Sequence, residues 1–485
     1  LWPGVQYRTG QAFDLAAIAR LAHDAGALCG LDLAHAVGNT ELALECLAPD
    51  AACRTDLMEI RKAAQRAADL TRQLLAFARH TVTQLVMSLG RNEEDWSAWY
   101  RLFSLRRFVY EAASRVVCGL TLAHVTEDEV YVVAGDATQT PRSSRKMEGA
   151  GWLRNLRTPP FMLGIHAAQR WFHGAWLTPA EQGYSRAVPL RWTPAFTEKS
   201  RPVAHAPRKE WEAALDFLRW LREQLAAAGR ARQPVLMVGD GHYDNLNLWR
   251  ALPEGVVLLA RSAKNRVLYQ FPGPQPGRGR RRRYGDRALT PQQLWQQGKG
   301  WQRLEFMVRG RVRHVQVKVC GPVLRRGAPD CPLMLIVVRG KGNRRIRRIP
   351  LPFLVNAVQD NAGRWRLPLP LDTLLFWAWQ RWEIEVCHRE LKSTFGLGHK
   401  QCWNPHAAVT SVQWSAWVYA VLLLAGYRAW GLCRGPAVPT RWWRGSGRWS
   451  LNTLWRAYRA ALWGAHEFRP LPSLSPDDWA ENPAL

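Results

Sequence analysis

The chain has 485 residues, enough for about two to four domains and for a core that needs no disulfide or metal to hold it together. Lysine and arginine number 67 against 39 aspartate and glutamate, which gives a formal net charge of +28. A charge excess of this size is typical of proteins that bind a polyanion, because neutralising phosphates releases counterions. It predicts nucleic acid as the partner, with an anionic membrane surface as the second choice.

The nine cysteines follow no repeating spacing, which argues for a reducing compartment and against a disulfide framework. Five metal-ligating side chains are close in sequence: Cys387, His388, His399, Cys402 and His406. Their spacing fits no common zinc finger. The start shows no export signal, and the longest apolar run, Trp417 to Ala425, is too short to span a bilayer. We expect a cytoplasmic, nucleoid-associated protein without a membrane partner.

The N-terminal 45 residues differ in character from the rest of the chain. They contain the stretch Gly4-Val-Gln-Tyr-Arg-Thr-Gly10 and end in Asp32-Leu-Ala-His-Ala-Val-Gly-Asn39. This text resembles kynureninase, a pyridoxal-phosphate enzyme, and the resemblance places Asp32 and His35 at the cofactor. The Schiff-base lysine that the family requires has no matching segment downstream. We therefore expect no pyridoxal-phosphate catalysis.

Residues 57–79 form a strongly helical run with apolar residues at steps of three and four. The run resembles the second helix of a sensor histidine kinase's dimerisation hairpin. The flanking parts of such a kinase are missing, so an isolated amphipathic helix is the simpler interpretation and no kinase activity is expected. The two fragments together predict a chimeric extension over residues 1–85, with Met58 or Met87 closer to the natural start than Leu1.

Residues 86–125 are predicted to be helical. Tryptophans and other apolar residues alternate there with arginines between Trp96 and Arg115, which indicates one or two helices with a basic side. Such helices could contact DNA or pack on a catalytic core, and the sequence leaves both interpretations open.

Two strand-like runs each end in an aspartate. Residues 129–136 close on Asp136, residues 234–240 close on Asp240, and the helical stretch 211–225 lies between them. Strand, helix and strand predict a mixed α/β sheet with both acids at strand ends. Either aspartate alone would be interpreted as an ordinary turn residue.

Residues 381–392 predict a helix that carries acid and base on one side. At 100° per residue, Arg381, Glu385 and Lys392 point within about 40° of one another, with His388 and Arg389 beside them. Taken alone, the pattern fits an amphipathic helix with solvated ion pairs equally well.

The two aspartates and this helix together resemble the DDE transposases of bacterial insertion sequences, specifically those whose glutamate lies in a Tyr-x2-Arg-x3-Glu-x6-Lys signature. Arg381, Glu385 and Lys392 match that spacing, whereas Ala378 stands at the tyrosine position. The similarity covers residues of about 90 to 430. It implies an RNase H-like α/β catalytic core with an inserted mainly-β domain, preceded by helical segments.

The resemblance assigns roles to particular residues. Asp136, Asp240 and Glu385 would be the catalytic acids and would hold two Mg²⁺ ions, with Mn²⁺ as a substitute, for hydrolysis at the transposon end and transfer of the 3′-hydroxyl to target DNA. Asp244 would assist Asp240. The side chains expected to contact DNA are Arg381, Lys392, Arg389, Arg142, Arg145 and Lys146. The partner would be double-stranded DNA, both terminal inverted repeats and target, bound by a homodimer.

The corresponding organisation is a chimeric extension (1–85), a helical part (86–125), a core (126–250 with 370–430), an inserted β-rich domain (251–369) and a tail (431–485). Two arginine-rich stretches, 278–283 and 344–348, are either solvated loops or phosphate contacts. A rival interpretation is a decayed or fused transposase that binds DNA through its charge without cutting it.

Overall fold

The computed structural model describes residues 83, 93, 95–105, 107–155, 164–275, 277, 279–340, 350–436 and 448–464. The chain divides into two compact units, Leu1–Trp96 and Ser97–Leu485, and every helix and strand given below lies in the second unit. The kynureninase-like and kinase-like fragments and the arginines of 344–348 fall outside the described residues.

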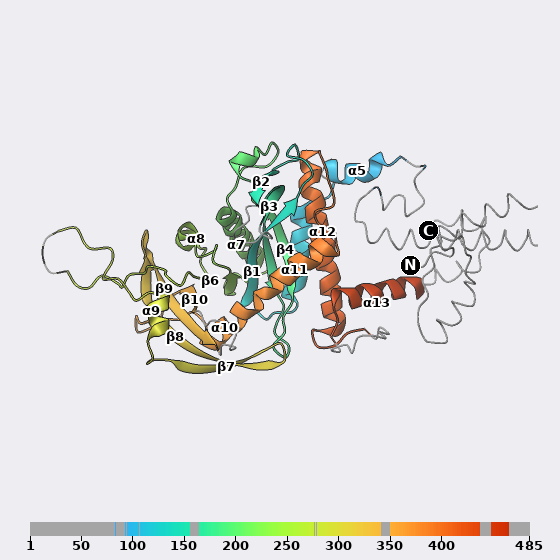
Figure 1. The fold of residues 1–485 in the computed structure, drawn as a ribbon. Helices are drawn as coiled ribbons and strands as arrows, with labels where there is room; N and C mark the ends of the chain where they lie inside the picture. The colour runs from blue at the N-terminus through green and yellow to red at the C-terminus, as the bar shows by residue number, and fades with distance from the viewer. Residues whose placement is uncertain are drawn as a thin grey trace, which may run out of the picture. The chain divides into compact units, whose positions relative to one another are not determined.

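The second unit is a mixed α/β structure built on one large sheet (Figure 1). Its strands are β1 (Tyr131–Pro141), β2 (Gly151–Arg154), β3 (Ile165–Leu177), β4 (Ala187–Pro194), β5 (Val235–Gly239), β6 (Val256–Arg261), β7 (Gln302–Val308), β8 (Arg311–Arg325), β9 (Ala328–Gly340) and β10 (Leu351–Asn356). Their order is β2-β3-β1-β5-β6-β10-β9-β8-β7. Strand β4 lies outside this order and pairs with β3. Strands β1, β5 and β6 run parallel, and the other pairings are antiparallel. A small ribbon of β11 (Val358–Gln359) and β12 (Trp365–Arg366) stands apart.

Helices cover the central strands on both faces. The helices are α5 (Ser97–Ser104), α6 (Tyr110–Leu122), α7 (Glu210–Ala227), α8 (Leu246–Ala251), α9 (Pro291–Gln296), α10 (Leu371–Gln380), α11 (Trp382–Ser393), α12 (Pro405–Trp430) and α13 (Leu451–Gly464), with a short 3₁₀ turn, η1 (Glu198–Ser200). Along β3, Phe172 meets Phe217 of α7, whereas the next residue, His173, meets His388 of α11. Successive side chains of a strand point to opposite faces, so α7 and α11 lie on opposite sides of the sheet.

Burial on both faces explains the sequence of the central strands. All five residues of β5 and the first five of β1 are buried, so these strands read as continuous apolar runs without alternation. The expected strands at 129–136 and 234–240 and the helix at 211–225 are present. In contrast, β3 and β4 were not predicted, because β3 mixes histidine, glutamine and arginine with its buried tryptophans.

The expected inserted β domain does not form a sheet of its own. The long strands of this interval are β7, β8 and β9, and β10 joins them edge to edge to β6. Strand β6 pairs in parallel with β5, so it belongs with the core strands. The strands on the two sides of the expected boundary at residue 251 therefore belong to one sheet.

Both N-terminal helices pack on the core. Phe103 of α5 and Phe108 contact the Trp414 ring of α12, and α6 packs against α12 and β4. Helix α12 is long and apolar enough to cross a membrane by length and composition, but residues such as Val412, Tyr419 and Leu423 are buried within the protein. It is therefore the core helix of this unit.

Gly174 of β3 gives a test of the packing between the sheet and α7. A Cβ added there would lie 2.4 Å from the Phe217 ring, which is fully buried. We expect Gly174→Ala to lower the free energy of unfolding by about 1 to 3 kcal/mol through overpacking. Urea unfolding would measure this. The matched control is Gly119→Ala on the open side of α6, where no atom lies within 4 Å, and it should stabilise slightly.

Candidate active site

The two aspartates predicted at strand ends lie on neighbouring strands in register. In the parallel pairing of β1 with β5, Gly135 is opposite Gly239, so Asp136 and Asp240 each follow directly after paired glycines. Adjacent strands are about 4.8 Å apart, which brings the two residues side by side. Strand β1 continues five residues beyond Asp136, whereas β5 ends at Gly239. Asp136 is therefore within a strand, not beyond one as the sequence suggested.

Glu385 comes to the aspartates from α11, across the face of the sheet. The predicted helix begins one residue later than expected: Arg381 lies in the turn between α10 and α11. From there its guanidinium hydrogen-bonds the Glu385 carboxylate, and its Nη1 lies 3.8 Å from Oδ2 of Asp136. Arg381 thus bridges two of the three acids.

The electrostatics of Asp136 show that all three acids influence one another. Burial and the nearby Asp240 carboxylate raise the pKa of Asp136 to about 7, and Glu385 adds to this effect. Arg381 and the backbone N–H of Ala137, 2.9 Å from Oδ1, act in the opposite direction. The fold therefore holds a concentration of negative charge that a cation would stabilise.

The donor set has the chemistry that Mg²⁺ prefers, since all three groups are carboxylate oxygens. Within the described ranges, no three His, Cys, Asp or Glu side chains are close enough to share a single metal ion. The three acids still supply hard oxygen donors, and bound cations would relieve their mutual repulsion. The residues therefore fit divalent cations. For the cluster from Cys387 to His406, the structure shows no such group among the described residues.

Three glutamates follow Arg381 on α11, and their partners tell them apart. Glu383 is buried and pairs with Arg309 at 2.7 Å. Glu390 pairs with Arg186 and accepts a hydrogen bond from the Tyr419 hydroxyl at 2.6 Å. These two carboxylates fasten α11 to the rest of the protein. Glu385 alone of the three faces the aspartates.

The expected DNA-contacting side chains fall into different environments. Lys392 hydrogen-bonds Thr138 of β1, two residues from Asp136, at 2.5 Å, and Arg389 is exposed. Arg142 is only 6% exposed and donates to Gln169 Oε1 and to the Lys400 carbonyl. Its burial lowers the pKa of the guanidinium to about 10. The donors of Arg142 are therefore used inside the protein, and its contact with DNA stays a prediction.

Asp244 also differs from its predicted role as a helper to Asp240. Its carboxylate is fully buried and pairs with Arg266 at 2.6 Å and Arg325 at 2.7 Å. It further accepts from Ser262 at 2.8 Å. Asp244 therefore joins the segment after β5 to β8 and to the segment after β6, and it supports the position of Asp240 only through the backbone.

Two histidines stand behind Asp136: His388, which the helical pattern placed beside Glu385, and His173, which the sequence did not reveal. His173 pairs with Asp136 across the β1–β3 ladder, and its Nδ1 lies 3.0 Å from Nε2 of His388. His388 Nδ1 is in turn 3.9 Å from Asp136 Oδ2. Burial lowers the pKa of His173 to about 3, and burial with the nearby His173 holds that of His388 well below its ordinary value. Only the fold could reveal His173, since β3 carries no sequence signal.

A pocket of about 350 Å³ lies beside Arg381. Its lining includes Arg261, Arg309, Arg313, Trp379, Arg381 and Trp382. Ala378, which stands at the signature tyrosine position, also lines it. The pocket therefore combines several cations with two indole rings next to the acids.

The raised pKa of Asp136 makes stability depend on pH. The Asp136 carboxyl ionises near pH 4 in the unfolded chain and near pH 7 in the folded protein. The free energy of unfolding of the metal-free protein should therefore fall as the pH rises from about 4 to about 7. Asp136→Asn removes this loss. Above pH 7 the variant should be more stable than wild type by at most about 4 kcal/mol, and near pH 4 the two should match.

Urea unfolding at several pH values in a chelator would measure the difference. Asp372→Asn, at an exposed carboxylate in the first turn of α10, is the control; because it keeps Asp136, its stability should fall between pH 4 and pH 7 as that of wild type does. A difference between Asp136→Asn and wild type that stays constant from pH 4 to pH 8 would contradict the buried, repelled carboxylate.

Comparison with known proteins gives two different results along the chain. The N-terminal part is similar to curated kynureninases: that of Xanthomonas axonopodis pv. citri (strain 306) is 75% identical over 44 residues, 9% of this chain and 10% of that enzyme. That of Stenotrophomonas maltophilia (strain K279a) is 68% identical over 50 residues, 10% of this chain and 12% of that enzyme. The chain spans about a tenth of the length of these relatives, which confirms the predicted fragment.

A family described as DDE superfamily endonuclease matches residues 57–319, more than half of the chain. The match begins within the predicted chimeric extension, includes Asp136 and Asp240, and ends before Glu385. The mixed α/β fold with its large sheet agrees with this family. The chain therefore belongs to the DDE superfamily endonucleases.

Proposed function

We propose that the protein is a DNA transposase that cleaves transposon ends and joins them to target DNA. The observation that carries this proposal is the convergence of Asp136, Asp240 and Glu385 from β1, the end of β5 and α11. Family membership supports a nuclease that acts on DNA. The Arg381, Glu385 and Lys392 spacing supports the narrower assignment.

We also propose that the core is RNase H-like. The order β4-β3-β1-β5-β6, with β1, β5 and β6 parallel and β3 antiparallel to both β1 and β4, supports this assignment. Helices on both faces agree with it. The strands β7 to β10 would then be an insertion that extends the same sheet at its β6 edge.

Members of this family use divalent metal ions. Asp136, Asp240 and Glu385 would hold two Mg²⁺ ions, and Mn²⁺ could replace them. Such a pair supplies an activated water or 3′-hydroxyl and stabilises the leaving oxygen. The residues around it have tasks of their own. Arg381, now paired with Glu385, could turn its planar fork to a DNA phosphate once the carboxylate has another partner.

The DNA would approach along α11. Arg389 is exposed there, and Lys392 reaches β1 beside Asp136. The arginines of the neighbouring pocket extend the same positive surface. The formal charge of +28 favours a duplex with many phosphate contacts. The partners proposed are terminal inverted repeats and target DNA, bound by a homodimer at the nucleoid.

Glu385→Gln tests the proposed chemistry. We expect the variant to lose cleavage of a labelled transposon end in Mg²⁺ by at least about a hundredfold, as is typical for groups that act on transition-state charge. The reason is that the amide keeps the shape but not the charge of Glu385. A gel assay of strand breaks would measure it. Asp372→Asn is the control, and equal cleavage by wild type and Glu385→Gln would refute the role.

Metal binding can be tested without activity. Since a ligand that binds only the folded state stabilises it, millimolar Mg²⁺ should raise the melting temperature of wild type. The same addition should raise it less in Asp240→Asn, which lacks one charged oxygen donor. Thermal unfolding followed by circular dichroism, with and without Mg²⁺, would show this. Equal shifts in both proteins would place the bound ion elsewhere.

A further inference from the structure

Two tryptophans stand at the surface, each beside a cation, where β1 ends and α12 begins. Trp152 of β2 is 59% exposed and Trp403 is 67% exposed. The Arg145 guanidinium lies 5.8 Å from the centre of the Trp152 ring, and the Lys146 ammonium lies 6.0 Å from the centre of the Trp403 ring. Neither cation has a carboxylate within 4 Å among the residues that the structure describes. We call these four residues the indole platform.

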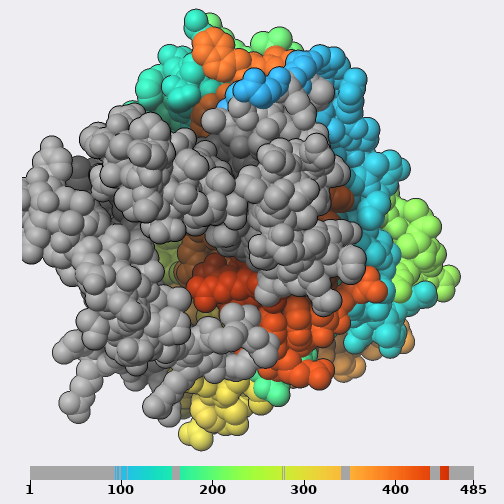
Figure 2. Space-filling view, turned by 90° about the vertical axis from the view of Figure 1, so that its right-hand side faces the viewer, coloured from blue at the N-terminus to red at the C-terminus, as the bar shows by residue number. Residues whose placement is uncertain are grey.

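The segments that carry the indole platform lie side by side at the surface. Ser143 donates its backbone N–H and its hydroxyl to the Gln401 side-chain oxygen, at 3.0 and 3.2 Å. Figure 2 shows the teal segment around β2 and the orange segment that enters α12 next to each other at the top. Side chains this exposed contribute little to the hydrophobic core, so core packing does not explain the positions of the two indoles.

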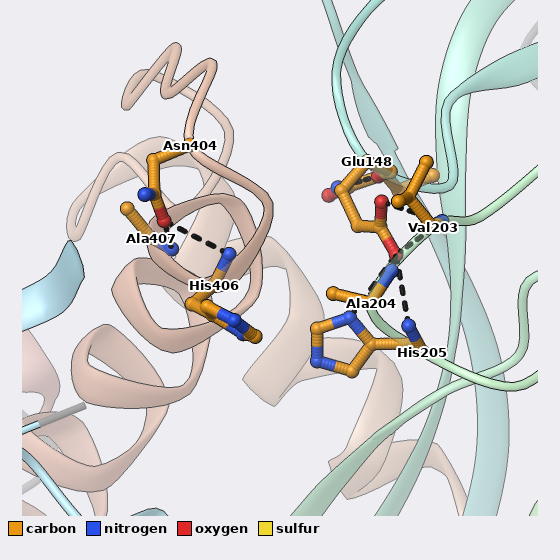
Figure 3. A network of polar contacts seen from close by, with 8 residues as sticks. Glu148, Val203, Ala204, His205, Asn404, His406 and Ala407 are labelled. Atoms are coloured by element: carbon orange, nitrogen blue, oxygen red, sulfur yellow. Dashed lines mark hydrogen bonds and ion pairs between the residues drawn. The ribbon is translucent and has the colours of Figure 1, made fainter. Parts of the chain in front are cut away.

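Polar contacts hold both segments in place (Figure 3). Glu148, two residues after Lys146, accepts hydrogen bonds from the backbone N–H groups of residues 203 to 205 and from the His205 ring. Burial alone would raise the pKa of Glu148, but these donors outweigh it and hold the pKa below its ordinary value. Asn404, directly after Trp403, accepts from the N–H groups of His406 and Ala407 at 3.0 Å each and so begins α12. The platform is thus presented on fixed backbone, which lowers the entropic cost of binding.

The platform is connected to the acids along β1. Lys392 contacts Thr138, Arg142 contacts the Lys400 carbonyl, and Ser143 contacts Gln401, so the chain after α11 follows β1 toward its end. Arg145 is nine residues from Asp136, at most about 30 Å along extended chain. That is the length of about nine nucleotides of a DNA strand. DNA bound at the acids can therefore reach the platform.

We propose that the indole platform binds unpaired bases of the DNA near the cleavage site, with Arg145 and Lys146 on the adjacent phosphates. The proposal rests on the proposed function. A paired duplex presents phosphates and groove edges to a protein, but its base faces are covered by stacking. An exposed indole beside a cation suits a free base face, and stacking is tolerant of sequence because every base has one. Cuts at staggered positions on the two strands of an element end would supply such unpaired nucleotides.

Fluorescence anisotropy with labelled DNA and no divalent metal tests the proposal. Two probes are compared: a blunt duplex, and the same duplex with a single-stranded extension of about ten nucleotides. Trp152→Ala and Trp403→Ala are each expected to weaken binding of the extended probe by about tenfold and to change binding of the blunt probe by less than about twofold. Val203→Ala, at an exposed apolar residue beside the Glu148 network, is the matched control and should change neither.

A second pair of variants identifies the kind of contact. Trp403→Phe keeps a flat aromatic face and should retain most of the affinity for the extended probe, whereas Trp403→Leu keeps only apolar volume and should lose it. Equal affinity of all variants for the extended probe would overturn the proposal. An unchanged DNA affinity with an altered oligomeric state in light scattering would overturn it in favour of contact with a second copy of this chain. Failure of wild type to bind either probe would count instead against the proposed function.

Discussion

The candidate active site is organised around the repulsion between carboxylates that the backbone holds close together. The parallel pairing of Gly135 with Gly239 sets Asp136 and Asp240 side by side, and α11 adds Glu385 from above the sheet. Arg381 contacts two of these acids, and it does not offset the burial that raises the pKa of Asp136 to about 7. A fold that keeps such a cluster forgoes stability at neutral pH, and sites of that kind are typically functional.

Helix α11 keeps the cluster open by fastening itself elsewhere. Its other two glutamates are paired with Arg309 and Arg186, contributed by the β7–β8 turn and by the approach to β4. On the buried side, His388 fills the space between the helix and β3 through its contact with His173. These contacts fix the direction of Glu385 without using it. The helix thus separates the groups that hold it from the group that faces the aspartates.

Strand β1, which carries Asp136, links the acids to the surface at the start of α12. Arg142 had the appearance of a DNA contact in the sequence, yet its buried hydrogen bonds to Gln169 and Lys400 make it a connector between β1, β3 and the chain that follows α11. Arg145 and Lys146, three and four residues later, remain at the surface beside the exposed indoles. This basic stretch therefore contains one buried arginine with a structural role and two exposed cations that face solvent.

Some of this followed from the sequence alone. Continuous apolar runs with an acid at or near their ends predicted β1 and β5, helical periodicity predicted α7 and α11, and the resemblance to the transposase signature singled out Glu385 among three glutamates. Local patterns suffice there because burial on both faces of a strand, or on one side of a helix, leaves a periodic trace.

The tertiary structure decided the rest. His173 and the strands β3 and β4 have no periodic signature, and the burial of Arg142 and Asp244 depends on partners up to 266 residues away in one case and up to 81 in the other. The continuation of one sheet through β10, which the sequence had divided into two domains, depends on a pairing between β6 and a strand almost a hundred residues later. Such contacts are chosen by the packing of the whole chain, and no local stretch of sequence records them.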